Sequence, residues 1–212
     1  MILVLNPNAT PWMTQRVAEA LARQLPAGTA LEPLTTADGP PVIDTAERFE
    51  AGARAGAAAL QARLGRAPAP RAVLLACFGD PGLEDLRRLA ASRPVVGLAE
   101  AAMRAAARRA GRFAVLTCGP AWVPLLQQRA RDFGLAEALA GVQALPVDGR
   151  TLAQDPGPWR GALQAAADAA VRDGARALVL GGAAFAGLGT LVQSTVPVID
   201  AIEAAAVELG GG

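Results

Sequence analysis

The sequence predicts an α/β protein made of two similar halves, each with a parallel sheet covered by helices. Three observations support this prediction. Short apolar runs alternate with Ala-rich stretches of helical periodicity, as expected when strands and helices follow one another in a parallel sheet. The apolar runs are continuous rather than alternating, which is typical of strands buried on both faces. The second half of the chain also repeats the pattern of the first.

In chain order, the expected strands are residues 2–5, 31–34, 72–76, 95–97, 113–116, 142–147, 177–180 and 196–199. The expected helices include residues 45–64, 84–91, 99–110, 121–133 and 159–173. A further helix is expected after Thr10, with Pro11 at its first position, where proline is well tolerated. The uncharged run 177–199 is long enough to cross a bilayer, but its glycines and Pro197 favour strand, loop, short helix and strand instead.

The repeat consists of segments that recur in the same order. Residues 71–83 align with 176–188, and residues 94–102 align with 197–205. Shorter matches pair 38–39 with 148–149 and 4–6 with 115–117. We therefore expect a first half of residues 1–96 with 198–212, completed by the C-terminal helix, and a second half of residues 97–197. Because ligands of open α/β sheets bind beyond the carboxyl ends of the strands, two such halves facing each other would share one active-site cleft.

The composition excludes several kinds of chemistry. Of 212 residues, 52% are apolar and 18% are charged, which is enough to bury a sizeable core. The chain has no His, and all 20 of its basic residues are Arg. It therefore lacks the amine of a pyridoxal-phosphate Schiff base and the imidazole of a Ser-His-Asp triad or a His metal site. Two cysteines cannot supply a tetrahedral zinc site, so acid–base chemistry would use thiols, carboxylates or water.

The charge balance also limits the partners that we expect. The 20 basic and 19 acidic residues nearly cancel, which leaves no basic surface for nucleic acid or an anionic membrane. The first residues run from an apolar segment straight into Asn-Pro-Asn, without the basic stretch of a signal peptide. A cytoplasmic location is therefore expected.

Cys77 is the first candidate for chemistry. It follows the apolar run 72–76 and opens a loop with two glycines, just before a helix that begins near Leu83. Backbone N–H groups and a helix N-terminus would favour a thiolate there. A buried cysteine that only fills space at the end of a strand is an equally good interpretation of this position alone.

Several segments resemble the aspartate/glutamate/hydantoin racemase superfamily, and most of all its hydantoin and allantoin racemases. The most specific is Cys-Phe-Gly-Asp-Pro-Gly at residues 77–82. The others, in order, are residues 6–10, 13–14, 39–40, 43, 97, 100–103 and 197–200. The resemblance implies two pseudo-symmetric Rossmann-like halves, a small-molecule substrate, no cofactor, and proton transfer at a carbon next to a carbonyl. It also implies assembly as a homo-oligomer.

In this family, two cysteines exchange protons with opposite faces of the substrate carbon. The resemblance gives Cys77 the first of these roles. The second cysteine would fall within residues 180–184, where this chain has Gly182. The internal repeat leads to the same position, because it aligns Cys77 with Gly182. One proton-transfer group is therefore missing, and symmetric racemisation by two thiols is not expected.

Cys118 is an alternative second thiol, because it follows the apolar run 113–116 at a loop that should line the cleft. The family usually has two threonines where this chain has Thr117 and Cys118. A small residue that replaces threonine is therefore the favoured interpretation, since a base displaced by about 1 Å can cost a hundredfold in rate. Cys118 and a water molecule both stay open as replacements for the missing group.

Other residues are expected to contact the substrate. Asn8 is assigned a hydrogen bond to a substrate oxygen, whereas Thr10 is expected to cap the helix that follows. Asp80 is interpreted as a turn residue rather than a base, because Asp-Pro-Gly is a common turn and helix-start sequence. Backbone N–H groups of two loops are expected to stabilise a developing oxyanion, those of Phe78, Gly79, Ala183 and Ala184.

Together these features predict a cofactor-independent racemase or epimerase of a hydantoin-, allantoin- or amino-acid-like substrate, slowed by the missing base. Two alternatives stay open. One is a single-cysteine, decarboxylase-like lyase, although such members of the superfamily keep the cysteine of the second half rather than the first. The other is a family member that binds its ligand without turning it over.

Overall fold

The computed structural model describes residues 1–185 and 189–210, in two compact units. By their contacts, the first unit is Met1–Leu98 with Ala205–Gly212, and the second is Ala99–Ala204. The chain passes from the first unit to the second at the start of helix α4 (Leu98–Ala110) and returns within helix α8 (Ala201–Gly210). Residues 186–188 of the expected repeat and residues 211–212 of the expected first half lie outside the described residues.

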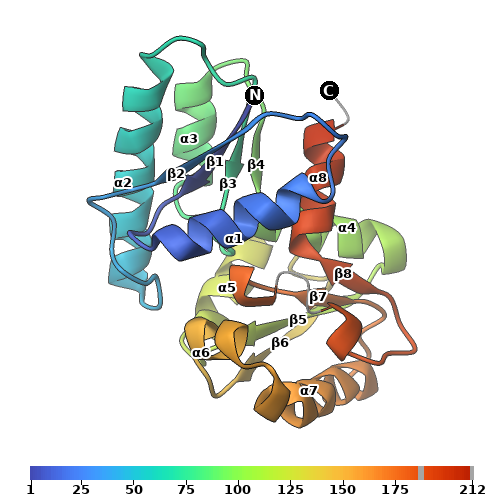
Figure 1. Cartoon of the computed structure of the whole chain (residues 1–212). Coiled ribbons are helices and arrows are strands. Elements are labelled where there is room, and N and C mark those ends of the chain that lie inside the picture. Colours follow the sequence, from blue (N-terminus) through green and yellow to red (C-terminus); the bar gives the residue numbers. More distant parts are fainter. Residues whose placement is uncertain (186–188, 211–212) are drawn as a thin grey trace. The chain divides into compact units, whose positions relative to one another are not determined.

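The first unit contains a parallel four-stranded sheet with strand order β2-β1-β3-β4. The strands are β1 (Ile2–Asn6), β2 (Leu31–Thr35), β3 (Ala72–Leu75) and β4 (Val95–Gly97). The helices are α1 (Pro11–Ala22), α2 (Ala46–Leu64) and α3 (Leu83–Ala90), and α2 lies beside α3 (Figure 1). Every residue of β1 and β3 is buried, which explains why their sequences are almost entirely apolar.

The second unit contains a parallel four-stranded sheet with strand order β6-β5-β7-β8. The strands are β5 (Phe113–Cys118), β6 (Leu139–Leu145), β7 (Leu178–Leu180) and β8 (Val198–Asp200). Three helices belong to this unit alone: α5 (Trp122–Asp132), α6 (Gly149–Gln154) and α7 (Arg160–Arg172). The described residues of this unit also form the short 3₁₀ turns η1 (Gly157–Trp159), η2 (Ala183–Phe185) and η3 (Gly189–Leu191). One face of the sheet forms an apolar core with α6 and α7 that includes Leu116, Leu152 and Leu163.

The uncharged run 177–199 forms β7, η2, η3 and most of β8 in its described residues, as the sequence predicted. No helix in residues 1–185 and 189–210 combines the length and the hydropathy that a membrane span requires.

The two sheets share their strand order and also their register. Val4 pairs with Leu74 in the first unit, and the equivalent Val115 pairs with Val179 in the second. The next strand follows the same rule, since Leu74 pairs with Val96 and Val179 pairs with Ile199. These pairings match the sequence repeat residue by residue. They confirm the predicted α/β fold of two pseudo-symmetric halves with parallel sheets.

Two elements differ from the sequence prediction. The sixth strand is Leu139–Leu145 rather than residues 142–147. Its last pairing joins Leu145 to Cys118, and the Leu145 carbonyl accepts the N–H of Gly119 at 2.9 Å. Helix α6 was not predicted, since six residues are too few to show an apolar period. It begins where Asp148 accepts hydrogen bonds from the N–H groups of Arg150 and Thr151, both at 2.9 Å.

Candidate functional site

Cys77 begins the loop that joins β3 to α3 in the first unit. Its carbonyl oxygen accepts the N–H of Asp80 at 3.1 Å, which closes a tight turn over Phe78 and Gly79. Three residues of the loop have positive φ, namely Gly79 at 117°, Asp80 at 55° and Gly82 at 72°. The two glycines suit these conformations because they have no Cβ. Within the described residues, the N–H groups of Phe78 and Gly79 have no acceptor, so both are available to a ligand.

Burial favours the neutral thiol form of the Cys77 side chain. Cys77 is 7% exposed. Loss of solvation, and then the charge of the nearby Asp80 carboxylate, raises the pKa of the Cys77 thiol far above its ordinary value. The expectation that this loop favours a thiolate is therefore wrong. Asp80 forms the turn that the sequence predicted, and it is fully buried.

The Asp80 carboxyl group packs directly on Gly97, the last residue of β4. A Cβ at Gly97 would clash with this carboxyl group, so only glycine fits there. By register, Gly97 corresponds to Asp200 in the second unit. The Asp200 carboxylate accepts the N–H groups of Ile202 at 2.7 Å and Glu203 at 3.3 Å, at the start of α8. Both units therefore place a carboxylate at the end of the fourth strand of their sheet. In the first unit it is that of Asp80, from the loop after β3, and in the second it is that of Asp200, the last residue of β8.

Asn8 lies at the same carboxyl edge of the first sheet as Cys77. It follows β1, and Cys77 follows β3, the parallel neighbour of β1. Asn8 is 6% exposed. Its side-chain oxygen Oδ1 accepts the N–H of Thr10 and the Nδ2 of Asn6, both at 3.0 Å. Its own Nδ2 has no partner among the residues that the structure describes.

Sequence reasoning missed the residues that hold Asn8. Asn6 is fully buried and donates from Nδ2 to the Thr14 hydroxyl at 2.9 Å. The Thr14 hydroxyl in turn lies 2.6 Å from the hydroxyl of Thr35 at the end of β2. The available signal was Asn6 itself, a polar residue in the apolar run that forms β1.

The side-chain capping prediction for Thr10 is wrong. Thr10 does occupy the N-cap position of α1, but its side chain makes no capping bond. The hydroxyl donates instead to the carbonyl oxygen of Pro41 at 2.6 Å. The N–H of Ala9 also donates to the Pro40 carbonyl at 3.0 Å. Both bonds fasten the loop after β1 to the loop after β2. Gly39 permits this close approach, since a Cβ there would lie 2.5 Å from the Pro7 carbonyl oxygen.

Gly182 occupies the position in the second unit that Cys77 occupies in the first. The hydrogen bonds show this equivalence. The residues just before them, Ala76 and Gly181, each donate an N–H to the first strand of their own sheet at 2.8 Å. The Gly182 carbonyl then accepts the N–H of Phe185 at 3.0 Å, as the Cys77 carbonyl accepts that of Asp80.

A side chain at Gly182 would find space but not a relaxed backbone. The nearest atom to an added Cβ would be Cδ2 of Phe185, at 3.9 Å. The φ of Gly182, however, is 131°, a value that residues with a Cβ rarely adopt. Ala183 and Ala184 follow in η2, and Ala184 is buried.

Thr117 and Cys118 lie at the end of β5, the neighbour of β7. The Thr117 hydroxyl donates to the Gly181 carbonyl at 3.1 Å, which ties β5 to the loop that contains Gly182. Cys118 is 7% exposed and belongs to the apolar core of the second unit. Burial, and then the charge of Asp148, raises the pKa of the Cys118 thiol to about 12. These surroundings support the interpretation of Cys118 as a packing residue.

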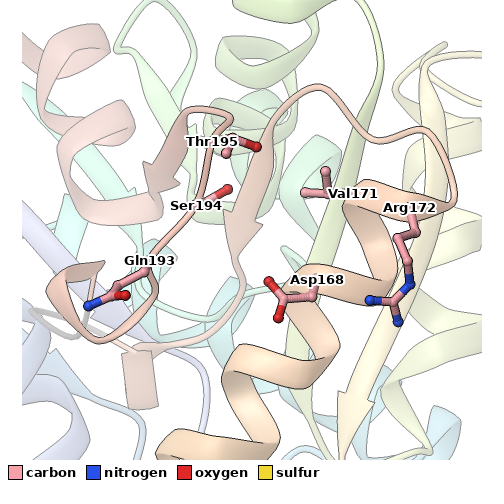
Figure 2. Close-up of a pocket in the computed structure, with 6 residues that line it drawn as sticks. All are labelled: Asp168, Val171, Arg172, Gln193, Ser194 and Thr195. Carbon is pink, nitrogen blue, oxygen red and sulfur yellow. The ribbon is translucent and has the colours of Figure 1, made fainter.

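The second unit has a surface groove of about 500 Å³. It lies between the C-terminal part of α7 and the segment before β8 (Figure 2). None of the predicted site residues lines it; its lining residues are Asp168, Val171, Arg172, Gln193, Ser194 and Thr195. In the described parts of the chain, no group of three His, Cys, Asp or Glu side chains is placed to hold a metal ion.

Comparisons with known proteins connect nearly the whole chain to one family. The family model described as Asp/Glu/Hydantoin racemase matches residues 2–209. The chain belongs to the Asp/Glu/hydantoin racemase family. The resemblance identified from the sequence is thereby confirmed, and membership of this racemase family supports isomerase activity.

Individual racemases are similar over most of their length. Hydantoin racemase of Paenarthrobacter aurescens is 34% identical over 207 residues, which cover 96% of this chain and 87% of the relative. Hydantoin racemase of Rhizobium meliloti is also 34% identical over 207 residues, covering 96% of this chain and 85% of the relative. The solved structure of allantoin racemase from Klebsiella pneumoniae has a TM-score of 0.89 at 30% identity, covering 99% of this chain and 86% of that one.

Proposed function

We propose that this protein is a cofactor-independent racemase or epimerase in which Cys77 is the proton-transfer group. One observation carries the proposal. The carboxyl edge of the first sheet gathers the Cys77 thiol, the unpaired N–H groups of Phe78 and Gly79, and the Asn8 carboxamide. Proton transfer next to a carbonyl needs a group that exchanges the proton and donors that stabilise the developing oxyanion. This edge supplies both.

The proposed reaction needs only the substrate, the Cys77 thiolate and water. The Cys77 thiolate forms an S–H bond while the substrate C–H bond breaks, and the electron pair moves onto the adjacent carbonyl oxygen. Hydrogen bonds from the N–H groups of Phe78 and Gly79 stabilise that oxygen, often the largest single contribution to such catalysis. Return of a proton to the same face restores the substrate, and delivery to the other face gives its enantiomer.

Glycine at position 182 makes proton transfer unequal on the two faces of the substrate carbon. Cys77 has a thiol, but the equivalent Gly182 has no side chain that can hold a proton. A water molecule then supplies the second proton, and the hydroxide that remains takes the proton from the Cys77 thiol, which restores both the water and the thiolate. Because a placed acid–base group contributes typically about 10²–10⁴-fold, we expect slow racemisation and faster hydrogen exchange in one enantiomer than in the other.

A five-membered cyclic ureide is the substrate class that we propose. The named relatives are hydantoin racemases and an allantoin racemase. In a hydantoin, the reacting carbon lies between a carbonyl group and a ring nitrogen, which makes its C–H bond more acidic. A single weak base can therefore remove this proton, which fits a site with one thiol.

A single-thiol lyase is the second candidate, and Gly182 favours it as well. After decarboxylation of a substrate with two carboxylates, one thiol is sufficient to protonate the enediolate. Cys77 would then act only as an acid, which suits its raised pKa.

Incubation of the purified protein in D₂O with the separate L- and D-enantiomers of a 5-substituted hydantoin distinguishes these functions. Polarimetry follows racemisation, and NMR follows deuterium at the reacting carbon. A sample without protein corrects for spontaneous exchange. Racemisation with deuterium uptake supports the proposal. Release of CO₂ from an aryl- or alkylmalonate without any exchange of hydantoins supports the lyase. Exchange of neither hydantoin enantiomer overturns the racemase.

Matched substitutions of the two cysteines test the assignment of Cys77. We expect Cys77→Ser to lower the exchange rate by at least about 100-fold, because the placed acid–base group is lost. Cys118→Ser makes the same chemical change in the second unit and should leave most of the rate. The reverse pattern would transfer the role to Cys118.

A further inference from the structure

The orientation of the Asn8 carboxamide is fixed by backbone groups. The N–H of Thr10 donates to Asn8 Oδ1 at 3.0 Å, and the N–H of Asn8 donates to Asn6 Oδ1 at 3.1 Å. A backbone N–H can only donate, so each of these bonds identifies the oxygen end of a side-chain amide. Asn6 Nδ2 then faces Asn8 Oδ1 at 3.0 Å, in agreement with both assignments.

Asn6 is held in turn by groups from α1 and from its N-cap residue, Thr10. Its Nδ2 donates to the Thr14 hydroxyl at 2.9 Å and lies 3.3 Å from the carbonyl oxygen of Thr10. Thr14 is 2% exposed and Asn6 is fully buried, so water does not compete for these bonds. Rotation of the Asn6 amide by 180° would place its oxygen against two acceptors, Asn8 Oδ1 and the carbonyl oxygen of Thr10. The buried bonds of Asn6 therefore also prevent rotation of Asn8.

The Nδ2 group of Asn8 is consequently the end that remains for a ligand. Among the described residues it has no partner, and it carries two N–H donors and no acceptor. Only a hydrogen-bond acceptor can satisfy it.

We infer that Asn8 is a donor-only contact for a carbonyl or carboxylate oxygen of the substrate, and that Asn6 and Thr14 are positioning residues that keep it so. The inference rests on the proposed function and adds to it a basis for substrate specificity. A substrate that presents an ammonium group or a ring N–H to Asn8 leaves two N–H donors unpaired. Sites built to hydrogen-bond one group reject analogues that lack it much more strongly than apolar pockets do.

Reversal of the polarity of Asn8 tests the contact itself. Asn8→Asp keeps the shape of the side chain but replaces its two donors by an acceptor. We expect the dissociation constants of hydantoin and of hydantoate, its open-chain carboxylate, to rise at least about tenfold in a calorimetric titration. Hydantoin has no stereocentre, so the titration measures binding without racemisation. Gln128→Glu makes the same chemical change on the exposed face of α5 and should leave both constants unchanged.

Substitutions of Thr14 test the positioning role. Thr14→Val removes the hydroxyl that accepts from Asn6, whereas Thr14→Ser keeps it. We expect Thr14→Val to raise KM about threefold to tenfold with little change in kcat, the size of one lost hydrogen bond, and Thr14→Ser to restore the wild-type KM. Equal effects of both variants, or a loss of thermal stability with unchanged KM, would overturn the positioning role.

The outcomes separate this inference from the proposed function. A wild-type protein that binds hydantoin or hydantoate but racemises no hydantoin overturns the proposed function alone. Unchanged binding in Asn8→Asp overturns the contact while racemase activity stands. A wild-type protein that binds neither probe overturns the inference.

Discussion

The acidity of Cys77 determines the pH at which the proposed reaction runs. Burial and the Asp80 carboxylate both raise the pKa of this thiol, so the thiolate fraction is small at neutral pH and grows as pH rises. We expect the rate of hydrogen exchange to increase with pH and not to level off near pH 7. Asp80→Asn removes the negative charge with little change in shape, and it should shift the rise to lower pH.

The pH–rate profiles of two matched variants check this expectation. Asp148→Asn makes the same change beside Cys118, and asparagine still caps helices well. Asp148→Asn should therefore have the same pH–rate profile as the wild-type protein. If Asp148→Asn shifts the profile and Asp80→Asn does not, Cys118 is the group that titrates.

Thr36 carries a polar group that is buried without a partner. It is 3% exposed, and its hydroxyl oxygen is the one buried side-chain polar atom in residues 1–185 and 189–210 without a hydrogen bond. Thr36→Val should raise the free energy of unfolding by about 1 kcal/mol, because valine buries no unsatisfied hydroxyl. Thr14→Val should lower it, since the Thr14 hydroxyl bonds to Asn6 and Thr35. Urea titrations measure both, and a loss of stability in Thr36→Val would contradict the argument.

Among the secondary-structure elements, strand β4 requires glycine at position 97, because the Asp80 carboxyl group packs directly against this residue. Gly97→Ala introduces a methyl group that clashes with this carboxyl group. We expect the variant to lose about 1–3 kcal/mol of unfolding free energy, as is usual for overpacked sites. Gly141→Ala in β6 is the matched control, since no atom lies within 4 Å of its added Cβ. Equal losses in the two variants would show that the cost arises from the strand backbone and not from Asp80.

The elements themselves were largely predictable, because continuous apolar runs and Ala-rich periodic stretches are local features of the sequence. What failed depended on partners that are distant along the chain. The Thr10 hydroxyl bonds to Pro41 rather than to its own helix. The bonds that hold Asn6 and Asn8 involve groups from both α1 and β2. The raised pKa of Cys77 comes from the depth of its burial, which no neighbouring residue in the sequence reveals.

At the scale of the whole molecule, the repeat is the feature that gives the sequence its predictive value. Because the two sheets share strand order and register, a residue of one unit identifies its counterpart in the other. This equivalence assigned Gly182 to the position of Cys77 from sequence alone, and the hydrogen bonds of the two loops agree with it. The repeat did not reveal that the backbone at Gly182 has a φ of 131°.

The proposal that Gly182 stands where a second proton-transfer thiol is missing is best tested with a pair of variants. Gly182→Ala and Gly182→Cys both place a Cβ on a backbone with a φ of 131°, so both should lose a similar amount of stability, about 1–3 kcal/mol. The added Cβ meets no atom closer than 3.9 Å, so the strain is conformational rather than steric. We expect Gly182→Cys to racemise a 5-substituted hydantoin at least about tenfold faster than Gly182→Ala, the low side of what a placed acid–base group contributes. Rates are compared only between samples shown by circular dichroism to be folded. A folded Gly182→Cys protein that racemises no faster than Gly182→Ala would show that this is not a racemase lacking one base, and the single-thiol lyase would become the leading function.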